Sequence, residues 1–186
     1  MKKMFLVAAA AALLIACNNK KSEESKTEGT DSTGKMESKT PPQSEFADAK
    51  YTDWGKKMSD QLSSGDMDGW LSNYADNAVY AWSGGDSLAG KAAIGKFWKD
   101  RRMNVIESIQ FSNDIWLPIK VNTSQKGPDM PGVWLMSWSQ VDVKYKKAKN
   151  PIMFWVHNLH HFDMNDKIDR TVSFIDFAPI NKAMGK

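Results

Sequence analysis

The chain has 186 residues, of which 41% are hydrophobic and 25% charged, and its formal net charge at pH 7 is +3. This small net charge, with both signs alternating along the chain, excludes a nucleic acid as the expected partner. The single cysteine excludes a disulfide framework within the chain. The residues after position 45 number about 140, which is enough for one domain with one core.

Residues 1–16 have the features of a secretory signal peptide. Lys2 and Lys3 supply positive charge, residues 5–12 are apolar, and small residues precede Cys17. Residues 5–16 number only 12, whereas a helix needs roughly 20 residues to cross a bilayer. The pattern resembles a bacterial lipoprotein signal. That resemblance implies cleavage after residue 16 and a protein attached to the lipid bilayer through lipidated Cys17.

Residues 17–45 are predicted to form a disordered tether that starts at the lipidated cysteine. The segment is rich in Lys, Glu, Ser, Thr and Gly, and Met36 is its only sizeable apolar side chain, so it cannot form a core. As a flexible coil it lets the domain stand roughly 30 Å from the membrane. Asn18, rather than Asp, follows the cysteine. By the same resemblance this favours the outer membrane, with a periplasmic or surface-exposed orientation left open.

The remaining residues, 46–186, are predicted to form one domain that opens with helices. Apolar residues at positions 46, 54, 58 and 62 predict a first helix, capped by Ser44 or Gln43. Asp66 is expected to cap a second, short helix that reaches Tyr74. A third helix is predicted over residues 91–102. One side of it carries Ile94, Phe97, Trp98 and Arg101.

After the third helix the apolar period changes to two, which predicts strands. An extended stretch over residues 105–121 is expected to be interrupted at Pro118, because proline is poorly tolerated in a central strand. A loop over 122–131 follows. A hairpin of residues 133–146 and 152–164 comes next, and a last strand is predicted over 168–178. Helices first and strands afterwards indicate the α+β class.

The segment 64–98 is the most specific part of the sequence. A Gly-Asp turn and a short helix lead into a strand over residues 74–80, followed by a Gly-Lys turn at 90–91 and another helix. This order resembles the nuclear transport factor 2-like superfamily, which includes ketosteroid isomerase and the SnoaL-like polyketide cyclases. The resemblance implies a cone-like, curved, mostly antiparallel sheet wrapped around the N-terminal helices, with an apolar cavity between them.

The same resemblance bears on catalysis. At the positions of the isomerase's tyrosine donor, general base and second acid donor, this chain has Met58, Trp82 and His160. Proton abstraction by that route cannot run without a base and an oxyanion donor. SnoaL-like cyclases use a His and Asp pair, which makes His160 a candidate catalytic acid or base. Strand parity puts Asp169 near the cavity mouth and Asp176 on the wrong face.

The aromatic content favours a ligand cavity. All eight tryptophans lie within residues 46–186, and they cannot all pack into one small core. Strand parity gives Asn158, His160 and Phe162 one common face, which is expected to point into the cone. The candidate ligand-binding residues are Trp54, Met58, Tyr80, Trp82, Asn158, His160, Phe162 and Ser173.

The strand predicted over 133–146 is apolar on both faces, because Trp134, Met136 and Trp138 alternate with Val133 and Leu135. This pattern predicts that one face lines the cavity and the other meets a partner subunit, as in the dimers that many members of the resembled superfamily form. A homodimer is therefore expected.

No metal site and no cofactor are predicted. His157 and His161 would lie about 13 Å apart on one strand, too far for two ligands of one zinc ion. Three hypotheses for function stay open. The first is binding of a small apolar or aromatic ligand. The second is a SnoaL-like isomerase, cyclase or hydrolase that uses His160, with Tyr80 or Asn158 orienting the substrate. The third is a non-catalytic, dimeric interaction module.

Overall fold

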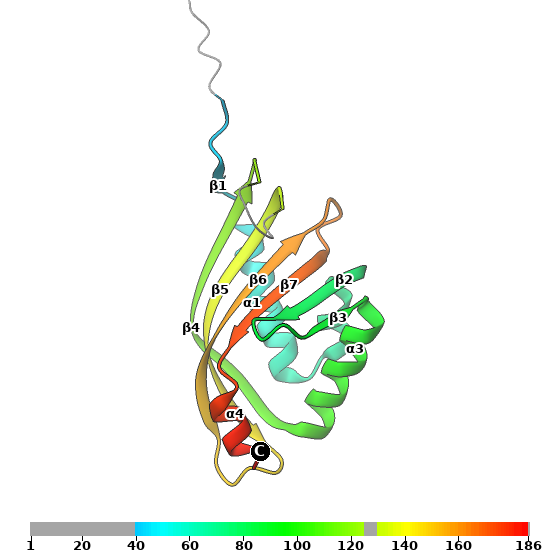
Figure 1. Cartoon of the computed structure of the whole chain (residues 1–186), viewed down its shortest axis with the longest axis vertical. Helices are drawn as coiled ribbons and strands as arrows, with labels where there is room; N and C mark the ends of the chain where they lie inside the picture. Colours follow the sequence, from blue (N-terminus) through cyan, green and yellow to red (C-terminus); the bar gives the residue numbers. More distant parts are fainter. Residues whose placement is uncertain (1–39, 125–129, 186) are drawn as a thin grey trace, which may run out of the picture. The chain divides into compact units, whose positions relative to one another are not determined.

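The computed structural model describes residues 40–124 and 130–185. The predictions for the signal peptide, Cys17 and most of the tether lie outside these residues. The described chain has the predicted α+β architecture, in which a curved sheet wraps around the long first helix (Figure 1). None of the helices in this part of the chain combines the length and the apolar composition that a membrane crossing needs.

Seven strands within the described residues form one sheet, in the spatial order β1-β4-β5-β6-β7-β2-β3. They are β1 (Ser44–Phe46), β2 (Tyr74–Trp82), β3 (Ser87–Ala89), β4 (Ile106–Val121), β5 (Gly132–Tyr145), β6 (Ile152–Phe162) and β7 (Ile168–Ile175). Only β2 and β7 pair in parallel, so the sheet is mostly antiparallel, as predicted.

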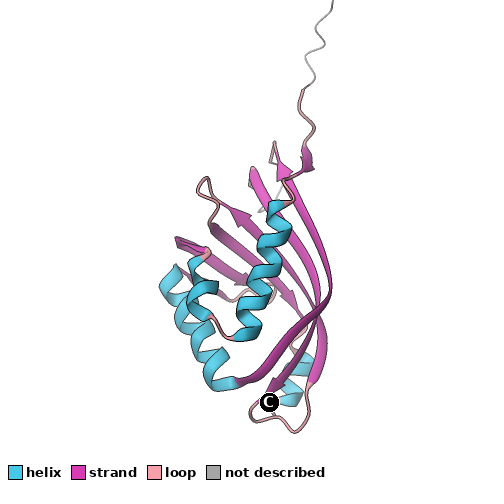
Figure 2. Cartoon of the chain, turned by 180° about the vertical axis from the view of Figure 1, so that it is seen from behind, coloured by secondary structure: helices cyan, strands magenta, loops and turns pink. Residues whose placement is uncertain are grey.

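The helices gather at the sheet's concave side, and Figure 2 shows the long one lying along it. They are α1 (Lys50–Ser64), α2 (Met67–Ser72), α3 (Lys91–Asp100) and α4 (Ala178–Ala183), with a π-helical turn, η1 (Arg101–Val105), that continues α3. Helix α4 was not predicted, because the last strand was extended to residue 178, whereas β7 ends at Ile175. Asp176 instead accepts a hydrogen bond from the Ala178 N–H at 2.8 Å, where that helix begins.

The first helix begins later than the sequence predicted. Phe46 lies in β1, which pairs with the end of β4, and its side chain is 76% exposed. Helix α1 starts at Lys50, whose N–H donates to the Asp48 carboxylate at 2.8 Å. Ser44 and Gln43 therefore do not cap it. The apolar residue at 46 was read into a helical period that it does not share, because it is extended and pairs with β4.

Gly55 lets helix α1 approach the sheet closely. A Cβ atom at this position would lie 2.5 Å from Cζ3 of Trp116 and 2.8 Å from Cδ2 of Leu135. The helix buries Met58 and Leu62 on the same side. The core of the domain therefore lies between α1 and the concave face of the sheet.

The turn from α1 into α2 follows the predicted chemistry. Gly65 ends α1 with φ of +85°, a conformation that glycine adopts without strain. Asp66 caps α2 by accepting a hydrogen bond from the Gly69 N–H at 2.9 Å. Tyr74 was predicted as the end of this helix, but it begins β2 and is 1% exposed.

Strand β4 runs through Pro118 without the predicted interruption. Pro118 pairs with Leu135 of β5, and its carbonyl accepts a hydrogen bond from the Ala47 N–H at 3.0 Å. The backbone polar side of Pro118 thus faces away from β5, so the missing N–H removes no bond to that strand. The strand bends instead at a bulge around Asn113, which has φ of +52°.

Candidate functional site

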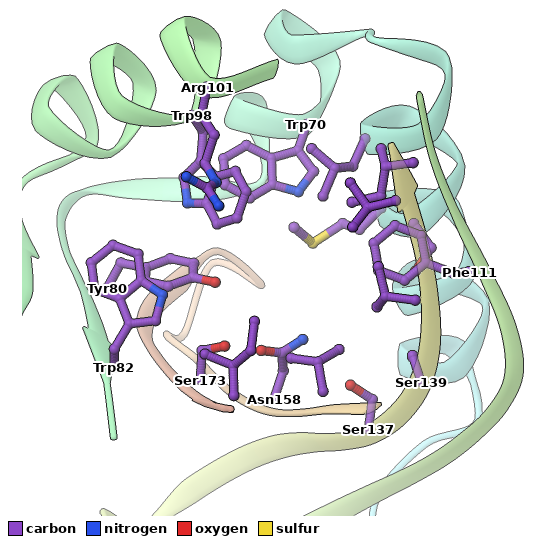
Figure 3. Close-up of a pocket in the computed structure, with 18 of the residues that line it drawn as sticks. Trp70, Tyr80, Trp82, Trp98, Arg101, Phe111, Ser137, Ser139, Asn158 and Ser173 are labelled. Carbon is purple, nitrogen blue, oxygen red and sulfur yellow. The ribbon is translucent and has the colours of Figure 1, made fainter. Parts of the chain in front are cut away.

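A cavity of about 490 Å³ lies between the concave face of the sheet and the helices (Figure 3). This volume is within the range of small-molecule sites. Every strand except β1 and every helix contributes to its wall. Most of the wall is apolar or aromatic and includes Met58, Leu62, Trp70, Trp82, Phe97, Trp98, Phe111, Trp116, Val141 and Phe154.

Six of the eight candidate ligand-binding residues line this cavity: Met58, Tyr80, Trp82, Asn158, His160 and Ser173. Trp54 and Phe162 do not. Their ring centroids lie 4.7 Å apart, and Phe162 also packs at 4.6 Å against Tyr51. The first turns of α1 place Tyr51 and Trp54 over Phe162, so these three rings form core packing outside the cavity.

Three buried polar atoms have no hydrogen-bond partner among the described residues: Trp98 Nε1, Trp116 Nε1 and Asn158 Oδ1. All three belong to side chains that line the cavity, although they come from α3, β4 and β6. Buried polar atoms are nearly always paired in folded proteins, and one left unpaired costs about 1–3 kcal/mol. In Figure 3, Trp98 and Asn158 lie on opposite sides of the open space.

Hydroxyl groups add further polar positions to the wall. Ser137, Ser139 and Ser173 are all buried and lie on the sheet side of the cavity, with Asn158 between Ser137 and Ser173 (Figure 3). Burial raises the pKa of Tyr80 to about 12, although a hydrogen bond with Ser173 and the positive charge of Arg101 oppose that rise. At neutral pH the Tyr80 phenol is therefore protonated and can donate.

His160 is buried and neutral. Its Nδ1 lies 2.9 Å from Oγ1 of Thr171, and burial lowers its pKa to about 4. Asp169, which was expected near the cavity mouth, is not a partner of His160, because a register shift after His161 turns the Asp169 carboxylate toward His161. The two are joined at 2.6 Å between Nδ1 and Oδ1. The structure therefore does not assemble a His160–Asp pair within the described residues.

The other two histidines, His157 and His161, lie on the convex face of the sheet. His157 donates from Nδ1 to the Ser137 carbonyl at 2.8 Å and stacks between Trp138 and Phe174, with ring centroids at 4.3 and 5.5 Å. In residues 40–124 and 130–185, no three His, Cys, Asp or Glu side chains come close enough together to hold a metal ion.

Arg101 is a cavity residue that the sequence reasoning did not select. Its Nη2 donates to the Tyr145 hydroxyl at 3.3 Å, and its Cζ lies 5.6 Å from the centre of the Tyr145 ring. The signal was present in the sequence, because Arg101 follows Ile94 by seven residues and so shares the apolar side of its helix. Nine lining residues of strands β4 and β5 were missed as well: Ile106, Ile109, Phe111, Trp116, Ser137, Ser139, Val141, Val143 and Tyr145.

The sequence matches no protein-family model and no curated protein. Solved structures do match the fold. A proposed isomerase from Bacillus subtilis has 17% identity and a TM-score of 0.56, over 72% of this chain and 91% of its own. A proposed SnoaL-like polyketide cyclase from Shewanella putrefaciens has 14% identity and a TM-score of 0.53, over 73% and 96%.

A protein from Catenulispora acidiphila with a ketosteroid isomerase-like fold, solved in complex with trimethylamine, has 13% identity and a TM-score of 0.52, over 70% of this chain and 91% of its own. At these identities the likeness concerns the fold. The chain therefore has the nuclear transport factor 2-like fold that the segment 64–98 predicted.

Proposed function

We propose that the domain binds a small, largely apolar or aromatic molecule in the cavity between the sheet and the helices. The observation that carries this proposal is the set of unpaired buried atoms, Trp98 Nε1, Trp116 Nε1 and Asn158 Oδ1, on side chains that line a mostly apolar space. A ligand with a few polar groups would pair with these atoms and cover the aromatic walls. The open volume of about 490 Å³ argues against the alternative in which the tryptophans themselves fill the cavity.

Mass spectrometry of the protein purified from its native host tests this proposal. We expect a small molecule that is present under native conditions and lost on denaturation. The matched variants are Ser139→Phe, which fills the cavity from β5, and Gln140→Phe, which adds the same ring to the opposite face of that strand. Ser139→Phe should lose the bound mass and Gln140→Phe should keep it. Equal retention by both variants would contradict a cavity site.

Catalysis by His160 is the second candidate and has weaker support. A general acid or base works best with a pKa near the working pH, whereas the pKa of His160 is lowered to about 4. Its hydrogen-bond partner is the hydroxyl of Thr171 rather than a carboxylate. Under the binding proposal, His160→Gln keeps the bound molecule chemically unchanged and bound. If wild type converts that molecule to a product and His160→Gln does not, the enzyme hypothesis replaces ours.

We also propose that the domain is anchored at the outer membrane of a bacterial cell through lipidated Cys17. The support is the sequence pattern of residues 1–17, and the tether would end near β1. Labelled palmitate fed to growing cells should appear in the wild-type protein. A Cys17→Ala protein that still takes up the label would overturn this proposal.

A second copy of the chain is the partner that we propose for the convex face of the sheet. Ile115, Trp155 and Phe174 are 57%, 52% and 42% exposed there. Contiguous apolar patches of this kind are unusual on soluble monomers. Light scattering should give a dimer mass for wild type and a monomer mass for Phe174→Glu. A monomeric wild type at high micromolar concentration would refute the dimer.

A further inference from the structure

We infer that the cavity ligand is an acid: an aromatic or polycyclic molecule with one anionic group, such as a carboxylate, that Arg101 binds. This inference rests on the proposed binding function and specifies the chemical class of the ligand. It starts from the position of Arg101, a charged side chain in the wall of a cavity that is otherwise mostly apolar or aromatic.

Two neighbouring arginines at the end of α3 have different environments. Arg102 donates from Nε to the Leu62 carbonyl at 3.0 Å and from Nη2 to the Ser63 carbonyl at 2.9 Å. It thereby satisfies backbone carbonyls at the end of α1, which is a structural role. Within the described residues, the Arg101 side chain makes one hydrogen bond, to the neutral hydroxyl of Tyr145.

No carboxylate within the described ranges lies at ion-pair distance from Arg101. A guanidinium has five N–H donors, and its charge is unfavourable in an apolar environment unless an anion or acceptors compensate it. The field of Arg101 reaches into the cavity, because it opposes the burial-driven rise in the pKa of both Tyr80 and Tyr145. Asp86 also lines the cavity, but it is exposed in the turn before β3 and is not paired with Arg101.

The polar groups of the cavity are arranged in two sets. Arg101 and Trp98 lie together on the helix side in Figure 3, and both offer only N–H donors. Asn158 and Ser173 lie across the cavity on the sheet side. The first set suits an anion, which accepts from the guanidinium and from the unpaired indole N–H. The second set suits a hydroxyl or amide, which can donate to the Asn158 oxygen. A hydroxylated aromatic or polycyclic carboxylic acid has both features.

A matched pair of dyes tests the inference. 1-Anilinonaphthalene-8-sulfonate and N-phenyl-1-naphthylamine share one ring skeleton, and only the first carries an anionic group. Their Kd values would be measured by fluorescence on wild type, Arg101→Met and Lys96→Met. Lys96 is exposed on α3 and is not part of the cavity wall, so it controls for the loss of one positive charge. Ser139→Phe shows whether each dye occupies the cavity.

We expect both dyes to bind wild type and to compete for one site that Ser139→Phe closes. Arg101→Met should raise the Kd of the sulfonate about tenfold or more, because a charge-assisted contact is lost, and change that of the neutral dye less than about twofold. Lys96→Met should leave both Kd values nearly unchanged. A variant that merely unfolds would lose both dyes equally, so the ratio of the two Kd values isolates the anion contact.

The remaining outcomes separate the two proposals. If both dyes bind in the cavity and Arg101→Met changes neither Kd, the anionic ligand class is wrong while the binding function stands. If Ser139→Phe leaves binding unchanged, or if neither dye binds wild type, the cavity is not the binding site that we propose and both proposals fail.

Discussion

The two faces of the curved sheet use similar side chains in opposite ways. On the convex face, Trp134 donates to the Met130 carbonyl at 2.9 Å, and His161 lies between Asp169 and the Pro131 carbonyl. On the cavity side, by contrast, Trp116 and Asn158 hold buried polar atoms without a partner in the described chain. Because unpaired buried atoms destabilise a fold, their confinement to one side indicates a function for that side rather than imperfect packing.

The largest effect that we predict concerns the aromatic wall. Trp70 is 4% exposed and packs 4.8 Å from Tyr74 and 5.7 Å from Trp98. Replacing it by alanine should lower the free energy of unfolding by about 3–5 kcal/mol, because a large buried ring leaves a void. Urea unfolding measures this. If the free energy of unfolding falls by less than about 1 kcal/mol, the cavity wall is loosely packed. Unpaired polar atoms on that side would then reflect poor packing rather than a function.

Acid should act through His160. Its pKa is about 4 in the folded protein and 6.5 as a free side chain, so between these values the unfolded chain binds a proton that the folded protein does not. The free energy of unfolding should therefore fall as the pH drops from about 6.5 to about 4, by about 3 kcal/mol from this group, and the contribution is fully present above that window. His160→Gln should remove this part of the pH dependence. Parallel curves for wild type and variant would show that His160 is not buried as described.

The contrast between the convex face and the cavity face is tested most directly at residues 157 and 158. They are adjacent in β6, and their side chains point to opposite faces of the sheet. Asn158→Leu removes an unpaired buried oxygen and should leave the unliganded protein equally stable or more stable by about 1 kcal/mol. His157→Leu breaks the hydrogen bond to Ser137 and should lower stability by about 1 kcal/mol. Thermal unfolding of both variants gives the sign of each change in stability. Destabilisation of similar size in both would mean that Asn158 is paired in solution.

Local patterns in the sequence predicted most of the elements. Asp66 caps its helix as expected, and the hairpin of β5 and β6 starts and ends within about two residues of its predicted bounds. The errors occur where tertiary contacts decide. Phe46 is extended because β4 offers it a pairing partner, and Pro118 is tolerated because its polar backbone side faces away from β5.

The site was predictable only in part, for two physical reasons. Alternation correctly placed Asn158 and His160 on the cavity wall, but one irregularity in register sent Asp169 to His161 on the other face. The alternation of side chains along a strand also does not tell how far along the strand the cavity extends. Phe162 faces the helices as predicted, but it lies under Tyr51 and Trp54, beyond the end of the cavity.

The smallest effect is predicted on the convex face and depends on protein concentration. Trp155 is 52% exposed, so Trp155→Ser should change the free energy of unfolding of the dilute protein by less than about 0.5 kcal/mol. If the convex face joins two copies, the wild-type melting temperature rises with concentration, because association stabilises the folded state. Trp155→Ser should then weaken that dependence. Scanning calorimetry at two concentrations a hundredfold apart measures both quantities. If the wild-type melting temperature does not depend on concentration, the exposed aromatic side chains of the convex face do not join two copies of the chain.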